Sequence, residues 1–214
     1  MSQFNLVLLG APGSGKGTQA KILSDNCGLK QISLGDILRQ EAHNNSDLGQ
    51  KVKSYMHQGV LVPDEIIQAV IEKAIEKAGF VLDGFPRNLN QAATLEKILA
   101  AKEIRLDKVI YLDVTQEVAV RRLSGRRICT FCGLLYHVVT MPPKKQGICD
   151  RCQKELAVRD DDKEETVRRR WRVFMDETHG LIEHYRGEGK LLPIDGNRDK
   201  DAVFEDVKTQ LASL

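Results

Sequence analysis

The sequence has no long hydrophobic run and no excess of one charge. No apolar stretch approaches the ~20 residues that a membrane-spanning helix needs, and its first ten residues lack the basic start and small-residue cleavage site of a secretory signal. We therefore expect a cytoplasmic protein that does not contact membranes. The 32 Lys and Arg nearly balance the 30 Asp and Glu, so the formal charge of +2 gives no general attraction to nucleic acids.

The sequence also lacks internal repeats, low-complexity tracts and an evident flexible linker. A chain of 214 residues can bury the core of one domain with a small excursion. Helical patterns separate four apolar, strand-like runs, which read FNLVLLG, FVLDGF, KVIYLDV and LLPIDG. This alternation predicts an α/β fold with a parallel sheet covered on both faces and with ligand-binding loops at its carboxyl edge.

The clearest helical pattern covers residues 63–79. It starts with Pro63 and two acids and stops at Gly79, which are usual residues for the two ends of a helix. The apolar residues at helical spacing form one face of this predicted helix: Ile66, Ile67, Val70, Ile71, Ala74 and Ile75.

The stretch GAPGSGKGT, residues 10–18, lies between the first apolar run and a helical pattern. Gly10, Gly15 and Lys16 fit the pattern G-x-x-x-x-G-K-[ST], whose backbone N–H groups surround a phosphate chain while the Lys reaches the terminal phosphates. The following helix N-terminus adds unpaired N–H groups and a partial positive charge. We therefore predict a polyphosphate site. Gly17, however, stands where a Ser or Thr hydroxyl would ligate magnesium.

Arginines recur in short motifs along the chain. Phosphoryl transfer depends mainly on positioning and on neutralising the charge of the transferred group, so an arginine-rich cleft suits it. The arginines are Arg39 in GDILR, Arg87 in DGFPR, Arg126 and Arg127 in SGRR, Arg159 in VRDDD, and Arg168, Arg169, Arg170 and Arg172 in EETVRRRWR. Because consecutive helical residues point in different directions, we expect Arg168, Arg169 and Arg172 to pair with nearby acids on the surface.

Residues 125–162 differ from the rest of the chain, since they are rich in Cys, Pro and Arg and their apolar stretches are not helical. Two C-x2-C pairs, Cys129 with Cys132 and Cys149 with Cys152, are separated by sixteen residues, which is the spacing of a four-thiolate zinc ribbon. Such a closed site leaves no position for substrate. We therefore expect a structural metal, zinc or iron, that replaces the core a small segment cannot bury.

These motifs resemble, in order and approximate spacing, those of the nucleoside monophosphate kinases. The matching segments GAPGSGKGT, GDILR, DGFPR, GRR, VRDDD, EETVRRR and IDG extend over nearly the whole chain. Within that family the sequence is most similar to adenylate kinases of the long-lid bacterial type with a four-cysteine zinc site. The resemblance implies a P-loop three-layer α/β fold with a five-stranded parallel sheet, a helical monophosphate-binding insert and a small zinc-ribbon lid.

The resemblance also implies domain limits and an activity. The core would comprise residues 1–32, 63–124 and 163–214, the insert residues 33–62, and the lid residues 125–162. The implied reaction is reversible phosphoryl transfer from ATP to AMP, which gives two ADP. Its cofactors would be Mg²⁺ bound with ATP and structural Zn²⁺. The expected partners are these nucleotides alone, and the protein would be a monomer.

Roles for individual residues follow from the same resemblance. ATP would contact Gly13, Ser14, Gly15, Lys16, Gly17, Thr18, Arg122, Arg126, Leu135, Tyr136 and Arg198. AMP would contact Leu34, Arg39, Val60, Leu61, Val62, Gly84, Phe85, Pro86, Arg87, Gln91, Arg159 and Arg170. The catalytic group would be Lys16, Arg39, Asp83, Arg87, Arg126, Arg159 and Arg170. No general base is implied, because a phosphate monoester is ionised at neutral pH.

Two further residues, Gly17 and Asp83, take a meaning from the resemblance. Gly17 is typical of adenylate kinases, whose magnesium binds nucleotide phosphates and waters without a protein hydroxyl; magnesium sheds its waters reluctantly. Asp83 would orient those waters. Since four thiolates saturate a metal ion, His137 is expected to pack or to face nucleotide, and Cys27 to be a small packed residue.

Two positions of the predicted acceptor pocket depart from the adenylate kinase pattern. Leu34 in SLGD replaces the usual Thr, and Asn88 after DGFPR resembles the pyrimidine kinases. Gln91 holds the adenine-reading position, so a UMP/CMP kinase is the alternative rather than the first choice.

A zinc-ribbon nucleic-acid-binding protein is a distant alternative, because the net charge of the chain is near neutral and the sequence lacks a clustered aromatic stacking platform. A P-loop switch would require a Ser or Thr after Lys16.

Overall fold

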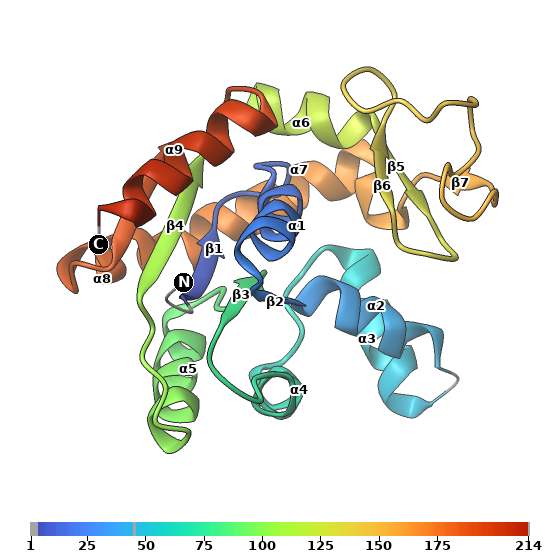
Figure 1. Cartoon of the computed structure of the whole chain (residues 1–214). Coiled ribbons are helices and arrows are strands. Elements are labelled where there is room, and N and C mark those ends of the chain that lie inside the picture. The colour runs from blue at the N-terminus through green and yellow to red at the C-terminus, as the bar shows by residue number, and fades with distance from the viewer. Residues whose placement is uncertain (1–3, 45, 214) are drawn as a thin grey trace.

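The computed structural model describes residues 4–44 and 46–213, with a parallel sheet at their centre (Figure 1). The sheet has five strands in the order β2-β3-β1-β4-β8, and all four pairings are parallel. The strands are β1 (Asn5–Leu9), β2 (Lys30–Ser33), β3 (Phe80–Asp83), β4 (Lys108–Asp113) and β8 (Leu191–Asp195). The predicted α/β fold with a five-stranded parallel sheet is confirmed.

Strand β2 is the one strand of this sheet that the apolar pattern did not predict. It lies at the sheet edge and reads KQIS, and among its residues Ile32 alone is buried. A short edge strand with one buried residue has no hydrophobic run to detect. Its pairing with β3 nevertheless matters for the site, because Ser33 lies opposite Asp83 at the carboxyl end.

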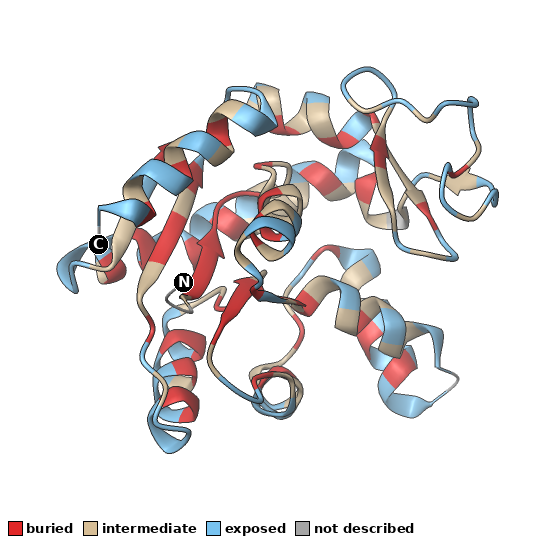
Figure 2. Ribbon diagram, viewed as in Figure 1, coloured by how far each residue is buried: buried red, intermediate tan, exposed pale blue. Residues whose placement is uncertain are grey.

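Helices cover both faces of the sheet, which gives three layers. Alternate residues of β1 point to opposite faces: Leu6 and Leu8 pack with α1 and α9, whereas Val7 and Leu9 pack with α4, α5 and α8. Figure 2 shows β1 and β3 almost entirely buried between these layers, and Val109, Ile110 and Leu112 of β4 are buried as well. The bounds are α1 (Lys16–Cys27), α4 (Asp64–Ala74), α5 (Leu89–Ala101), α6 (Gln116–Ser124), α7 (Glu164–Val173), α8 (Gly180–Gly187) and α9 (Lys200–Ala212).

Helix α4 is shorter than its sequence pattern predicts. It ends at Ala74, and Ile75 already has an extended backbone. The Ile75 side chain is nonetheless fully buried in the core, as the helical pattern led us to expect. The chain leaves the helix there to turn into β3, and Gly79 adopts a positive φ of 88° just before that strand. The residues after Ala74 therefore form a connection rather than a last helical turn.

Two further segments lie beside the sheet. One is the helix pair α2 (Leu34–His43) and α3 (Asp47–Gln58), each of which starts at a serine whose side chain accepts a hydrogen bond from the first turn. The other is a small antiparallel sheet in the order β6-β5-β7, with β5 (Arg126–Cys129), β6 (Leu135–His137) and β7 (Leu156–Ala157). A 3-10 turn η1 (Asp160–Asp162) leads from β7 to α7, and the π-helix η2 (Phe174–Thr178) joins α7 to α8.

No helix in the described part of the chain is both long and apolar enough to cross a bilayer.

Candidate active site

The glycine loop connects β1 to α1 at the carboxyl edge of the sheet. Its turn requires left-handed backbone at Gly13 and Gly15, whose φ angles are 87° and 96°. A Cβ atom on Gly13 would lie 2.6 Å from the Ala119 carbonyl oxygen of α6, so the loop also packs too closely for a side chain there. The loop therefore opens onto the N-terminus of α1, where backbone N–H groups are available to an anion.

The Lys16 side chain lies across this loop. Its Nζ donates to the carbonyl oxygens of Gly10 at 2.6 Å and Ala11 at 2.9 Å. Burial lowers the pKa of Lys16 to about 8, although the carboxylate of Asp83 acts in the opposite direction. A polyphosphate beside this ammonium group would favour its charged form.

Gly17 and Asp83 are neighbours. A Cβ atom built on Gly17 would lie 3.2 Å from Asp83 Oδ2, which is tighter than an ordinary carbon–oxygen contact. Burial raises the pKa of Asp83, whereas the nearby Lys16 lowers it. A Ser or Thr at position 17 would crowd this carboxylate, so the glycine provides space for the acid that ends β3.

Five arginines from separate segments of the chain converge beyond the loop, and three aspartates pair with four of them. Arg39 and Arg159 both face Asp36, the latter at 3.8 Å. Within residues 125–162, Arg126 holds Asp162 through two hydrogen bonds, one of them 2.7 Å from its Nε to Oδ2. The pairs also include Arg170 with Asp161 at 2.9 Å and with Asp162 at 3.6 Å.

Positive charge exceeds negative charge in this cluster. Burial, followed by repulsion from Arg170, lowers the pKa of Arg87 to about 10. Burial, followed by repulsion from Arg126, lowers the pKa of Arg159 to about 10 as well. Repulsion between the cations thus adds to the effect of burial, and a phosphate placed among them would relieve that repulsion.

Arg87 is held in place along its whole length. Its backbone N–H donates to Gln91 Oε1 at 2.8 Å and its Nε donates to the Gly84 carbonyl at 2.8 Å. Its own carbonyl accepts from Thr178 Oγ1 at 2.7 Å. Thr178 is buried on the π-helix η2, a helix type often found at functional sites. Thr178 was not predicted from the sequence, because nothing near position 178 indicates that it contacts position 87.

A pocket lies between α2, α3, the start of α4 and the arginines. Eight of the residues expected to contact AMP line it: Leu34, Arg39, Val60, Leu61, Val62, Arg87, Gln91 and Arg170. Gly84, Phe85, Pro86 and Arg159 are not among its lining residues, and the Phe85 side chain is buried in the core. Gly35, Leu38, Met56, Gly59, Ile67 and Asp161 line the pocket although the sequence analysis did not select them.

The residues expected on the ATP side are more dispersed. Arg122 donates from Nη1 to the Ser14 carbonyl at 3.4 Å and from Nη2 to the Arg198 carbonyl at 2.8 Å, so it joins the glycine loop to the segment after β8. The Arg198 side chain pairs with Asp206 and Asp195. Tyr136 is buried, with its hydroxyl 3.5 Å from Cys149 Sγ. The Tyr136 ring therefore packs beside the clustered cysteines, and its contact with ATP stays a prediction.

Comparison with known proteins identifies the family. A model of the adenylate kinase family matches residues 8–190. The chain belongs to this family. Adenylate kinases of Archaeoglobus fulgidus and Caldicellulosiruptor saccharolyticus are 44% and 49% identical to it, over 99% of both chains in the first case and over 92% of this chain and 93% of the relative in the second. That of Lachnoclostridium phytofermentans is 48% identical over 95% of this chain and 96% of its own. The predicted family is confirmed.

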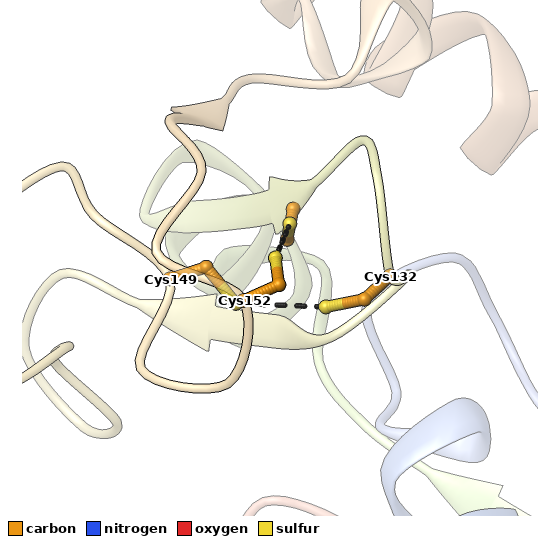
Figure 3. Close-up of side chains that lie close together, drawn as sticks. Cys132, Cys149 and Cys152 are labelled. Atoms are coloured by element: carbon orange, nitrogen blue, oxygen red, sulfur yellow. Dashed lines mark hydrogen bonds between the residues drawn. The ribbon is translucent and has the colours of Figure 1, made fainter.

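The four clustered cysteines of this adenylate kinase family member come together as predicted. Their sulfur atoms all lie within 4.8 Å of one another, and the shortest pairs are Cys129 with Cys152 at 3.3 Å and Cys132 with Cys149 at 3.5 Å. Figure 3 shows Cys132, Cys149 and Cys152 turned toward one another. Tetrahedral zinc with Zn–S bonds of about 2.3 Å places its sulfurs about 3.8 Å apart, so the donor set fits such an ion.

Both cysteine pairs occupy turns of the same design. The Cys129 carbonyl oxygen accepts from the Gly133 N–H at 2.9 Å, and the Cys149 carbonyl oxygen accepts from the Gln153 N–H at 2.9 Å. Gly133 and Gln153 both have positive φ, 73° and 59°. Two equivalent turns that face each other aim four thiols at one point, which is the geometry of a closed metal site.

His137 and Cys27 lie outside this cluster. The His137 Nδ1 accepts from the N–H groups of Val139 and Thr140, and its ring packs on Gly125, where a Cβ atom would be 2.2 Å from its Nε2. Cys27 packs against the core between the sheet and helices α1 and α9. Both residues therefore have the packing roles expected from the sequence.

Two of the three arginines expected to pair on the surface do so. Arg168 pairs with Glu164 at 2.8 Å and Arg169 with Glu165 at 3.3 Å, each one helical turn apart on α7. Arg170, between Arg169 and the next turn, points instead to the pocket. Neighbouring positions of α7 thus face in different directions. Arg168 and Arg169 pair with acids on the surface, whereas Arg170 lines the pocket.

Proposed function

We propose that this chain catalyses reversible phosphoryl transfer from ATP to AMP, which produces two ADP. The observation that carries the proposal is the convergence of Lys16 and five arginines between the glycine loop and the pocket that Gln91 lines. Two phosphate-binding regions on either side of a shared cationic cluster suit a reaction that passes a phosphoryl group between two nucleotides. The names of the relatives support adenylate kinase activity and do not support a nucleic-acid-binding role.

In this reaction the residues position and neutralise, and none needs to remove a proton. The loop from Gly13 to Thr18 would bind the donor phosphates, with Lys16 next to the transferred group. Arg126 and Arg159 would reach that group from the lid, and Arg170 lies between the two sides. Arg39 and Arg87 would hold the acceptor phosphate. Because an AMP phosphate is anionic at neutral pH, its oxygen can attack directly while these cations stabilise the charge of the transition state.

We propose Mg²⁺ and structural Zn²⁺ as the cofactors. An oxygen donor beside the loop is the Asp83 carboxylate, a ligand type that suits magnesium and its waters. Magnesium bound with ATP would neutralise phosphate charge. The four thiols fit zinc and leave no open position, so that metal would stabilise the lid and take no part in transfer.

We also propose the division into a core, a monophosphate-binding insert at residues 33–62 and a lid at residues 125–162. Arg159, from the lid, lies close to Asp36, from the insert. The cationic cluster is thus assembled from elements on both inserts and on the core. Approach of both inserts would complete the site and exclude water. We further propose a cytoplasmic monomer whose partners are these nucleotides, since the near-neutral charge gives no general attraction to nucleic acids.

Hydrolysis of ATP without an acceptor should consequently be very slow compared with transfer to AMP. Water can act as acceptor only if the site assembles around ATP alone, and the acceptor phosphate contributes to that assembly through Arg39 and Arg87. The measurement is release of phosphate from Mg-ATP with and without AMP. Hydrolysis at a rate close to that of transfer would contradict the proposed closure.

AMP should be preferred over CMP and UMP by at least about tenfold in kcat/KM. The reason is the buried Gln91 amide, since a base that leaves the hydrogen-bonding groups of this amide unpaired binds less well. Leu34 lacks a hydroxyl contact worth roughly 1 kcal/mol, which is too little to reverse this preference. The preference is measured by the rate of diphosphate formation from Mg-ATP and each monophosphate. Gln91→Leu should reduce the ratio of kcat/KM for AMP to that for CMP or UMP. Equal or better turnover of CMP by the unmodified protein would favour a pyrimidine kinase instead.

A further inference from the structure

The amide of Gln91 is held at both of its ends. The residue is 2% exposed and lines the acceptor pocket. Its Nε2 donates to Asp64 Oδ1 at 2.7 Å, and its Oε1 accepts from the backbone N–H of Arg87 at 2.8 Å. Asp64 is the first residue of α4, so a residue from a different helix determines how the Gln91 side chain lies.

The two partners permit only one orientation of this amide. A carboxylate can only accept hydrogen bonds and a backbone N–H can only donate them. Rotating the amide by half a turn would place Oε1 against the Asp64 carboxylate and Nε2 against the Arg87 N–H. Both hydrogen bonds would be lost inside a buried site, where unpaired polar groups are costly.

Asp64 is itself kept in position. Asn88 Nδ2 lies 3.5 Å from the same Oδ1, and Asn88 also accepts from the Gln91 backbone N–H at 2.8 Å, which caps helix α5. Asp64, Asn88 and Gln91 therefore form one connected group between α4 and α5. The asparagine that departs from the usual Thr thus contributes to the arrangement of Gln91.

An amide in a fixed orientation distinguishes bases that a rotating amide would not. Gln91 retains one free N–H and one free lone pair, because each of its polar atoms can make a second hydrogen bond. Adenine offers an amino donor beside a ring-nitrogen acceptor. Hypoxanthine and guanine offer the reverse order, an oxo acceptor beside a ring N–H donor. A half-turn of the amide would exchange the order of its own donor and acceptor and fit the second kind of base.

We propose that Asp64 is a specificity-determining positioning residue, which fixes the Gln91 amide so that the pocket accepts a 6-aminopurine and rejects a 6-oxopurine. Asp64 acts through Gln91 and does not need to touch the substrate. The inference rests on the proposed function, since AMP as acceptor defines which order of donor and acceptor the pocket matches.

The test compares AMP with IMP, which differs at the 6-position of the base and in the ring proton next to it. Asp64→Ala removes the acceptor and should lower the AMP-to-IMP ratio of kcat/KM about tenfold, mainly through a higher KM for AMP and a lower KM for IMP. Asp64→Asn keeps an oxygen that can accept from Nε2 but adds an amide N–H that can donate to Oε1, so it should restore only part of the ratio. Asp64→Ser, whose hydroxyl can donate or accept, should relax the ratio as Asp64→Ala does and suits a helix N-terminus.

Glu65→Ala is the matched control. Glu65 lies in the same first turn of α4 and is exposed, so its removal takes the same charge from the helix N-terminus. Glu65→Ala and Asp64→Asn lose the same charge, so their melting temperatures should change by similar amounts. Glu65→Ala should leave the AMP-to-IMP ratio of kcat/KM unchanged. An unchanged ratio in both Asp64→Ala and Asp64→Ser, or equal losses toward AMP and IMP, would refute the positioning role. Failure of the unmodified protein to phosphorylate AMP would instead refute the proposed function.

Discussion

Replacement of Lys16 by Met should reduce phosphoryl transfer by a factor on the order of a hundred or more, as expected for loss of a preorganised charged donor at the transition state. Lys16 Nζ lies across the glycine loop, 2.6 Å from the Gly10 carbonyl and near Asp83, where a transferred group would carry developing charge. Met preserves much of the side-chain volume. The loss should therefore appear in kcat with little change in the melting temperature.

Lys21→Met provides the control for this variant. Lys21 is on the same helix α1, and its side chain is exposed and pairs with Asp25 at 3.1 Å. Such exposed pairs contribute at most about 1 kcal/mol to stability, so Lys21→Met should keep nearly full activity. If Lys16→Met retained most of the transfer activity while Lys21→Met behaved as wild type, the phosphate-loop assignment of Lys16 would be wrong.

Disruption of the proposed zinc site should produce the second large effect. Cys129→Ser removes one of four thiols that lie within 4.8 Å of one another. A loss of about 3 kcal/mol, well below the free energy of binding of a structural zinc ion, would lower Tm by about 6–12 °C in a chain of this length. Activity should fall too, because Arg126 and Arg159 lie at the two ends of this segment.

Metal analysis provides the direct measurement, with about one ion per chain expected for four ligands. Chelation under mildly denaturing conditions should loosen the lid before it unfolds the sheet, since all four ligands lie within residues 125–162. Cys27→Ser is the control, because Cys27 packs on the core outside the cluster and should leave the metal content unchanged. Absence of metal together with five freely reactive thiols in the native protein would rule the site out.

Features that depend on short stretches of chain could be predicted from the sequence. The glycine loop, the two C-x2-C turns and the apolar runs of β1, β3, β4 and β8 each involve residues close together in the chain. Backbone conformation and hydrophobic periodicity act at that range. The resemblance to the nucleoside monophosphate kinases added the fifth strand, β2, whose single buried residue provides no such local pattern.

The sequence by itself determined the chemistry that is present: a loop for phosphates, a set of arginines and four thiols at metal-binding spacing. Only the tertiary structure decided which groups meet. Thr178 reaches Arg87 from 91 residues away, Asp162 holds Arg126 from 36 residues away, and Asp64 orients Gln91 from 27 residues away. Side-chain partners at such separations are determined by how helices and strands pack, and packing depends on the whole core rather than on any local pattern. The same cause turns the Tyr136 ring toward the cysteines and ends α4 at Ala74, where Ile75 enters the core.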